Sequence, residues 1–267
     1  MPRVAVNGVQ LAYEEAGAGS PLLLIHGFAC GRRVWAPQIQ ALATRHRVIA
    51  YDVRGFGRSE APRDPAQYSQ PISVEDAHAL LGALGAMPAA VCGLSMGGNI
   101  ALNLALVHPE AVSALILCDT GVGSEDPAGF RARCEEFARA AEQRIEAFCE
   151  SALAWQVFAD YVAQGDAQRT LARQMILAHP AHGIALTARH TLGPRRPVYD
   201  LEPGLGALRI PTLVVYGERD VGCVESSRFL GKAIHGACIW EVPGATHFVN
   251  LDAPEAFNRR VLEFLGA

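Results

Sequence analysis

The segment GLSMG places Ser95 between Gly93 and Gly97, directly after one apolar run and before another. Where a strand turns sharply into a helix, side chains two residues before and two residues after the turn would collide. Glycine at positions 93 and 97 removes that collision. The strained turn lifts the serine hydroxyl out of the sheet. The segment therefore predicts that Ser95 is a nucleophile; a serine that only caps the helix N-terminus is the alternative.

A serine nucleophile needs a base that takes its proton and an acid that holds this base in one tautomer. Among the nine histidines, His247 directly follows a late predicted strand, in the loop VPGATHFVN. Asp220 ends the strand predicted before it, in VVYGERD, and the chain order Ser95, Asp220, His247 is one in which such triads occur. Asp119, which ends the run LILCD, is the alternative acid because it lies at the tip of the preceding strand. We expect a Ser-His-Asp triad.

Attack on a carbonyl group creates negative charge on its oxygen, and fixed N–H donors stabilise that charge. The backbone N–H of Met96 lies at the positive end of the predicted helix. In LLIHGFACG, Gly27 allows a sharp turn that directs the backbone N–H of Phe28 towards the serine. The Phe28 and Met96 amides are therefore the predicted oxyanion hole. We expect His26 in the same stretch to hold the loop through a structural hydrogen bond.

Short apolar runs alternate with amphipathic stretches through the first 120 residues, which is typical of strand and helix units around a mostly parallel sheet. The same alternation returns at residue 211. The predicted strands are 3–8, 10–16, 21–27, 47–53, 89–94, 113–119, 211–220 and 238–244. The predicted helices are 35–45, 73–85, 96–108, 224–233 and 254–265.

Residues 121–203 have a different texture, because strand-like runs disappear and RARCEEFARAAEQRIEAFCESALAWQVFADYV shows apolar residues at helical spacing among charges. We therefore expect an α/β core domain of residues 1–120 and 204–267. The segment between them, residues 121–203, is expected to be a helical cap inserted after the sixth strand.

The composition is that of an ordinary soluble globular protein, with 50% hydrophobic residues, 19% charged residues and a formal net charge of −4. Nothing in it favours binding to nucleic acid or to a membrane. The N-terminus MPRVAVNGVQ lacks the residue order of a secretory signal, so we expect a cytoplasmic protein. The seven cysteines are widely spaced without any C-x-x-C pair, which favours reduced, packed thiols over disulfides or structural zinc.

Five short motifs fall within residues 1–120 and 205–267: HGF at 26–28, YDVRGFGRS at 51–59, GLSMGG at 93–98, GERD at 217–220 and GATHF at 244–248. In these motifs the chain resembles the α/β-hydrolase superfamily. The resemblance implies an eight-stranded, mostly parallel sheet flanked by helices, with a helical cap over the active site. GLSMGGNIAL and THFVNLDAPEAFN are similar to 3-oxoadipate enol-lactonases and small carboxylesterases. This similarity implies hydrolysis of a small carboxylic ester or (enol-)lactone through an acyl-enzyme.

Other branches of the superfamily provide the alternatives. Enzymes that open haloalkanes or epoxides carry an aspartate where Ser95 stands, which argues against both activities. Carbon–carbon bond hydrolases of aromatic catabolism commonly have asparagine before the serine and tryptophan after the histidine, where this chain has Leu94 and Phe248. Cofactor-free perhydrolases share HGF and SMGG. Carbon–carbon hydrolysis and perhydrolysis therefore stay open, and a hydrolase-fold ligand-binding protein is the least favoured alternative.

The cap is expected to set substrate choice. Trp155, Phe158 and Tyr161 have roughly helical spacing and, with Phe248, are the candidates for lining the pocket. One cap arginine is a candidate to bind a substrate carboxylate, whereas most should pair with neighbouring glutamates. These arginines are Arg131, Arg133, Arg139, Arg144, Arg189, Arg195 and Arg196. The sequence has no H-E-x-x-H, phosphate-loop or G-x-G-x-x-G motif, so we expect no metal or organic cofactor and only a small-molecule substrate as partner.

Overall fold

The computed structural model describes residues 1–266 and contains an eight-stranded sheet with the strand order β1-β2-β4-β3-β5-β6-β7-β8. The strands β1 and β2 pair antiparallel, as do β2 and β4, and all other pairs are parallel. The strands are β1 (Arg3–Val6), β2 (Val9–Ala16), β3 (Ser20–Ile25), β4 (His46–Tyr51), β5 (Ala89–Leu94), β6 (Val112–Cys118), β7 (Thr212–Gly217) and β8 (Cys238–Val242). The predicted fold class is confirmed.

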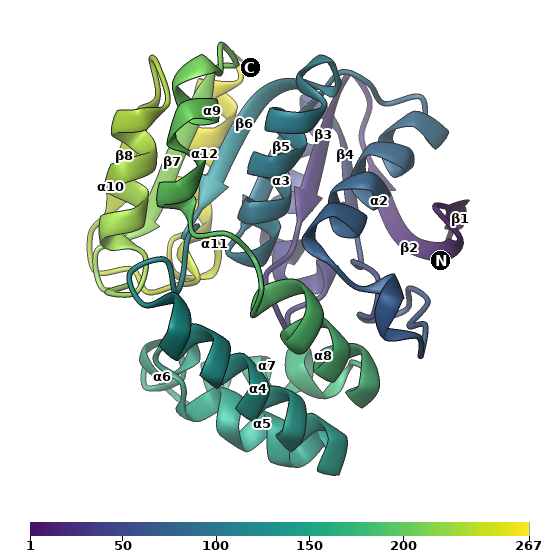
Figure 1. Cartoon of the computed structure of the whole chain (residues 1–267). Coiled ribbons are helices and arrows are strands. Elements are labelled where there is room, and N and C mark those ends of the chain that lie inside the picture. Colours follow the sequence, from purple (N-terminus) through teal and green to yellow (C-terminus); the bar gives the residue numbers. More distant parts are fainter. Residues whose placement is uncertain (267) are drawn as a thin grey trace.

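Helices cover both faces of this sheet, which explains why its central strands are nearly all apolar: β5 and β7 are buried at every residue. Figure 1 shows α2 and α3 on the near face and α12 behind the sheet. The helices around the sheet are α1 (Ala36–Leu42), α2 (Gln70–Ala83), α3 (Met96–Val107), α9 (Glu202–Ala207), α10 (Val224–Ala233), α11 (Val249–Asp252) and α12 (Pro254–Phe264). Short 3-10 turns are Arg32–Trp35, Pro65–Gln67 and Pro109–Ala111.

The predicted cap segment, residues 121–203, connects β6 to β7 and is helical. Its helices are α4 (Pro127–Gln143), α5 (Ile145–Ala154), α6 (Gln156–Val162), α7 (Asp166–Leu177) and α8 (Ala181–Thr187), followed by a π-helical turn, Ala188–Leu192. Figure 1 shows α4 to α8 as a separate layer beyond the carboxyl ends of the parallel strands. The chain contacts the core again before residue 204. The ring centre of Tyr199, in the 3-10 turn Val198–Leu201, lies 4.8 Å from that of Phe229 in α10.

The elements differ from the sequence prediction mainly at their ends. The strand predicted over 211–220 stops at Gly217, because residues 218–220 form a turn in which the Asp220 N–H donates to the Gly217 carbonyl at 3.0 Å. The helix predicted over 73–85 begins earlier, at Gln70, because the Ser69 hydroxyl accepts from the Ile72 N–H at 3.2 Å as an N-cap. The short helix α11, which directly follows the loop of His247, was not predicted from the sequence.

All seven cysteines are free thiols, six buried and only Cys238 exposed. Within residues 1–266, no helix combines the length and the apolar character that crossing a membrane requires.

Candidate active site

Ser95 lies on the turn between β5 and α3, with the strained backbone angles φ 55° and ψ −110°. Hydrogen bonds hold the turn on both sides. The Ser95 N–H donates to the Cys118 carbonyl at 2.8 Å, and the backbone and side-chain N–H groups of Asn99 donate to the Ser95 carbonyl at 3.0 and 3.1 Å. A non-glycine residue in such a region costs roughly 1–3 kcal/mol, so the surrounding structure must stabilise this conformation.

The two glycines of the turn have no room for a side chain. A Cβ atom on Gly93 would overlap the Gly97 carbonyl group, and a Cβ atom on Gly97 would overlap the carbonyl oxygen of Ile25 at the end of β3. The close approach of Gly97 to β3 brings the serine next to the loop that follows β3. Gly27 in that loop lies so near that an added Cβ would meet the Ser95 Cβ at 3.5 Å.

His247 lies in the loop after β8, and its Nδ1 is 2.7 Å from Oδ2 of Asp220, which follows β7. Both side chains are buried. Because the carboxylate can only accept, Nδ1 carries the proton, and in the neutral ring Nε2 is left with a free lone pair. Burial acts to raise the pKa of Asp220, but the charge and the hydrogen bond of His247 outweigh it and hold that pKa below its ordinary value.

Asp119, the alternative acid, has different hydrogen-bond partners from Asp220. It is fully buried after β6, its Oδ1 accepts from the Gly217 N–H at 2.9 Å, and its Oδ2 has no partner among residues 1–266. Burial, together with the negative charge of nearby Asp220, raises the pKa of Asp119 well above the ordinary value. Asp220 rather than Asp119 thus makes the hydrogen bond to His247.

The loop after β3 is fixed by His26. Its Nε2 accepts from the Val53 N–H at 2.9 Å, so the proton is on Nδ1, which donates to the Gly27 carbonyl at 2.7 Å. Burial lowers the pKa of His26, which favours this neutral ring. The backbone N–H of Phe28 in this loop makes no hydrogen bond within the described chain, and that of Met96, the first residue of α3, has no acceptor within the helix. Both N–H groups remain free for a ligand oxygen.

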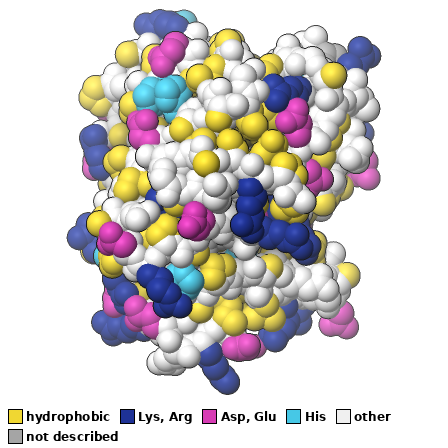
Figure 2. Space-filling model, turned by 90° about the vertical axis from the view of Figure 1, so that its right-hand side faces the viewer, with side chains coloured by type: hydrophobic (Ala, Val, Ile, Leu, Met, Phe, Trp, Pro, Cys, Tyr) yellow, Lys and Arg dark blue, Asp and Glu magenta, His cyan; other side chains and the backbone are white. Residues whose placement is uncertain are grey.

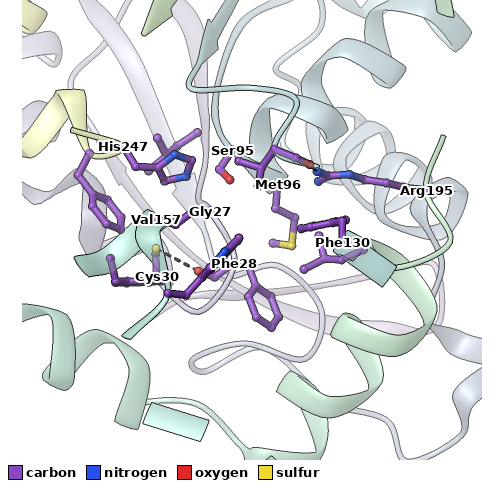
Figure 3. A pocket seen from close by; sticks show the side chains of 15 residues that line it. Gly27, Phe28, Cys30, Ser95, Met96, Phe130, Val157, Arg195 and His247 are labelled. Carbon is purple, nitrogen blue, oxygen red and sulfur yellow. Dashed lines mark hydrogen bonds between the residues drawn. The ribbon is translucent and has the colours of Figure 1, made fainter. Parts of the chain in front are cut away.

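A cavity of about 370 Å³, counted with its open mouth, contains both Ser95 and His247. Figure 3 shows their side chains next to each other, with Phe28, Met96 and Arg195 around the same space. The lining residues are Gly27, Phe28, Cys30, Leu94, Ser95, Met96, Val122, Phe130, Trp155, Val157, Phe158, Leu192, Arg195, His247 and Phe248. Most of the lining is apolar, as is usual for small-molecule sites.

Of the four residues predicted to line the pocket, Trp155, Phe158 and Phe248 do so. Tyr161 is not among the lining residues and instead packs its ring 5.1 Å from that of Phe248. The sequence analysis missed Phe130 and Val157, although Phe130 lies at the start of a recognisable amphipathic helix.

Two groups of side chains have a composition that could hold a metal ion. Asp220, Cys223 and His247 have ligand atoms within 4.8 Å of one another, but Asp220 and His247 are hydrogen-bonded to each other. The Cys223 thiol donates to the Asp119 carbonyl at 3.2 Å. Glu75, His78 and His108 form a second group outside the cavity, with Glu75 and His78 on α2 and His108 directly after the end of α3. The first group is therefore explained by hydrogen bonding alone.

Comparison with known proteins identifies the fold family of the chain. A family model described as alpha/beta hydrolase fold matches residues 20–153. The chain is 32% identical over 285 residues to "Putative carbamate hydrolase RutD" of Azorhizobium caulinodans, covering 100% of this chain and 98% of the relative. It is 29% identical over 226 residues to 3-oxoadipate enol-lactonase 1 of Acinetobacter baylyi, covering 84% and 80% of the two chains.

The crystal structure of the enol-lactonase from Burkholderia xenovorans LB400 superposes with a TM-score of 0.85 at 28% identity, and each chain is covered completely. The strand order, the tight turn at Ser95 and these matches agree with one another. The chain belongs to the α/β-hydrolase fold family.

Proposed function

We propose that the protein hydrolyses small carboxylic esters or lactones through an acyl-enzyme on Ser95, with His247 as the general base and Asp220 as the acid that orients it. The observation that carries the proposal is the presence of Ser95 and His247 in one cavity, with Oδ2 of Asp220 2.7 Å from Nδ1 of His247. The hydrogen bond at Nδ1 leaves Nε2 as the proton acceptor, which is the tautomer a serine nucleophile requires.

In the first half of the reaction, the Ser95 Oγ bonds to the carbonyl carbon while its proton moves to Nε2 of His247. The tetrahedral intermediate collapses, the bond between the carbonyl carbon and the alcohol oxygen breaks, and Nε2 returns the proton to the leaving alcohol. In the second half, Nε2 takes a proton from water, whose oxygen attacks the acyl group. The bond to Oγ then breaks, and the proton goes back to Ser95.

The free N–H groups of Phe28 and Met96 are the proposed oxyanion hole. Each donor of this kind is worth about 10²–10³ in rate in enzymes where one has been removed. The positive end of α3 adds to the field at Met96. His26 acts on this hole indirectly, because its two hydrogen bonds fix the loop that carries Phe28.

The names of the relatives support the substrate class. Enol-lactonases among them hydrolyse an ester bond within a ring, and the lactone ring would open at the same Ser95. A carbamate is the second candidate substrate, because the relative named as a carbamate hydrolase matches the whole chain. Both reactions start with attack of a nucleophile on a carbonyl group, so one catalytic apparatus serves either of them.

Stopped-flow hydrolysis of 4-nitrophenyl esters from acetate to decanoate tests the proposal, with 4-nitrophenyl carbamate as an additional substrate. We expect a burst of nitrophenol followed by steady turnover on the esters. Ser95→Ala should lower kcat by about 10⁶. Ser113→Ala, which changes an exposed serine of β6, is the matched control and should behave as wild type.

A Ser95→Ala variant that keeps a tenth of the wild-type activity would contradict the mechanism. Turnover on the carbamate alone would move the assignment to carbamate hydrolysis. Acylation of Ser95 without turnover on any substrate would favour the ligand-binding alternative.

A further inference from the structure

We propose that Arg195 binds a carboxylate of the substrate, so that the preferred substrates are esters or lactones that carry a second, ionised carboxyl group. This inference rests on the proposed function, because it assigns the part of the substrate that lies away from Ser95. It would make Arg195 the residue that determines specificity.

Arg195 reaches into the catalytic cavity from the segment that leads out of the cap. It follows Pro194 after the π-helical turn, and it lines the same cavity as Ser95 and His247. Figure 3 shows its side chain extending towards Ser95 and Met96. Its guanidinium carbon lies 4.7 Å from the centre of the Phe130 ring, and one of its N–H groups donates to the Val122 carbonyl. These two contacts hold the guanidinium group in place and leave other donors free.

No carboxylate neutralises this cation within residues 1–266. The fully buried arginines of the core are both paired: Arg32 lies 2.5 Å from Asp52, and Arg54 lies 2.7 Å from Asp76. Four cap arginines also have glutamate partners; these are Arg133, Arg139, Arg173 and Arg189. Arg195 differs from all of them, because no Asp or Glu of the described chain lies within ion-pair distance.

An unpaired cation in apolar surroundings is costly. Arg195 is half-buried, and burial of its guanidinium group lowers its pKa to about 10, so the side chain stays charged at neutral pH. Arg195 contacts Val122, Phe130 and Leu192, and none of these offers an acceptor side chain. A ligand that brings its own negative charge removes this cost, which gives anionic substrates an advantage over neutral ones of the same shape.

The geometry of the guanidinium group selects the kind of anion. Its planar fork matches the two oxygens of a carboxylate. The cavity that contains both Arg195 and Ser95 is lined mainly by apolar side chains, Met96 among them. The substrate therefore combines a reactive carbonyl group, a short apolar linker and a terminal carboxylate, as in a half-ester of a short dicarboxylic acid or in a lactone with an acidic side chain.

The test compares each carboxylate substrate with its neutral amide. For a charge on the acyl side, the pair is the 4-nitrophenyl half-ester of glutaric acid and the corresponding glutaric monoamide ester. For a charge on the alcohol side, the pair is 4-carboxyphenyl acetate and 4-carbamoylphenyl acetate. We expect kcat/KM of the wild type to favour the carboxylate in one of these pairs.

In Arg195→Gln, kcat/KM for the favoured carboxylate should fall by about 10- to 100-fold, which is the typical value of a charge-assisted hydrogen bond. The value for its amide should change less than about threefold. Arg195→Lys keeps the charge without the planar fork and should be intermediate. Arg196→Gln is the matched control, because Arg196 is exposed and bonds to the Asp200 carbonyl outside the cavity.

Equal loss on carboxylate and amide in Arg195→Gln would overturn the proposal, since it would show that Arg195 only supports the fold through Val122 and Phe130. A wild type that does not distinguish carboxylate from amide in either pair would overturn it as well.

A protein that hydrolyses none of these esters refutes the proposed function, and calorimetric titration with glutarate then tests the site separately. Glutarate binding that is present in Ser95→Ala and lost in Ser95→Ala/Arg195→Gln would support the site. The absence of glutarate binding in both would refute it.

Discussion

The core contains buried ion pairs in addition to surface ones, whereas the ion pairs of the cap segment are all at least partly exposed. In the core, Arg32 and Arg54 are buried and contact the buried carboxylates Asp52 and Asp76. In the cap, the ion pairs lie at the surface; in one of them, Arg189 contacts Glu135 and Glu142 at 2.8 and 2.5 Å. Breaking a buried pair leaves an uncompensated charge, whereas exposed pairs contribute little. The core is thus held in one arrangement, while the cap surface tolerates changes of charge.

The two regions meet through aromatic side chains next to the proposed catalytic groups. The ring of Phe28, whose amide belongs to the proposed oxyanion hole, lies 5.7 Å from that of Phe148 in α5. The ring of Phe248, which follows the proposed base His247, lies 5.1 Å from that of Phe158 in α6. We infer that the core supplies the chemistry and that the cap adjusts it through these rings. The predictions below test this division.

After the loss expected for Ser95→Ala, the largest effect is expected at the carboxylate that contacts His247. Asp220→Asn should lower kcat by about 10⁴, because an asparagine at this position favours the wrong tautomer of the imidazole. Asp119→Asn should lower kcat far less, because Asp119 makes no hydrogen bond to His247 and an amide oxygen can still accept from the Gly217 N–H. The measurement is kcat on the best ester for both variants.

The variant Asp119→Asn should also change how thermal stability depends on pH, which thermal unfolding of variant and wild type over a pH series measures. The pKa of Asp119 is raised in the folded state, so wild-type stability falls as the pH rises from about 4, the ordinary pKa of an aspartate, towards the raised value. Asp119→Asn cannot titrate and should therefore gain stability relative to wild type as the pH increases over this window.

For the activity measurement, a greater loss of kcat in Asp119→Asn than in Asp220→Asn would reverse the assignment of the two acids.

The next effect concerns the turn that carries the nucleophile. Gly97→Ala places a Cβ against the Ile25 carbonyl, so the turn must shift, and a displacement of about 1 Å can cost 10²-fold in rate. We expect kcat to fall by about 10²–10³ on all substrates alike. Gly206→Ala in α9 is the matched control, because an added Cβ there meets nothing within 4 Å. Normal activity in Gly97→Ala would mean that the position of Ser95 does not depend on the close approach to β3.

The proposed catalytic residues of the core could be named from the sequence because each one follows a strand: Ser95 follows β5, Asp220 follows β7 and His247 follows β8. The spacing of Gly93 and Gly97 already required the turn at Ser95, and the loop of His247 followed directly from a strand. The sequence favoured Asp220 but left Asp119 as the alternative, because the two residues follow neighbouring parallel strands. The choice between them depends on the turn after β7, where the Arg219 N–H donates to the Ala245 carbonyl at 2.9 Å, a long-range contact that no local pattern encodes.

In the cap, the sequence predicted helices and two of the side chains that line the cavity, Trp155 and Phe158, but it missed Phe130 and Val157. Tyr161, also a candidate, does not line the cavity. Trp155 and Tyr161 were placed on one helical face, yet the helix breaks between α5 and α6. Trp155 itself is the extended N-cap of α6, with φ −75° and ψ 139°. Spacing across such a break says nothing about a shared face. Arg195 lies in a segment between Pro194 and Pro197 without any periodicity, so its place in the cavity depends on tertiary packing.

The contact between cap and core should weaken in acid through His179. This residue lies between α7 and α8, and its Nδ1 accepts from the Gly57 N–H of the core at 2.8 Å. Burial lowers the pKa of His179 to about 4, and nearby His26 acts in the same direction while Asp52 opposes it. The ordinary pKa of histidine is about 6.5, so stability should be lost as the pH falls from about 6.5 to about 4. The loss attributable to His179 is about 3 kcal/mol at most.

Urea unfolding at pH 7 and pH 4.5 measures this effect. His179→Gln keeps an acceptor for Gly57 but does not titrate, so its loss of stability between the two pH values should be smaller than that of wild type. His235→Gln, which changes an exposed histidine after α10, is the control and should retain the wild-type loss. Equal losses in His179→Gln and wild type would show that His179 is not the acid-sensitive contact.

The smallest effect is expected where the cap touches the substrate without touching the reacting atoms. Phe158→Leu removes part of a buried ring that lines the cavity beside Phe248. The larger cavity should move the optimum of the 4-nitrophenyl ester series to longer acyl chains, and kcat/KM on acetate should fall by less than about tenfold, as is typical of one or two methylene groups. Phe229→Leu, which loses a ring packed on Tyr199 outside the cavity, should leave the optimum unchanged. A uniform fall of kcat on every chain length in Phe158→Leu would mean that the ring positions His247 through Phe248, and the cap would then share in the chemistry that we assign to the core.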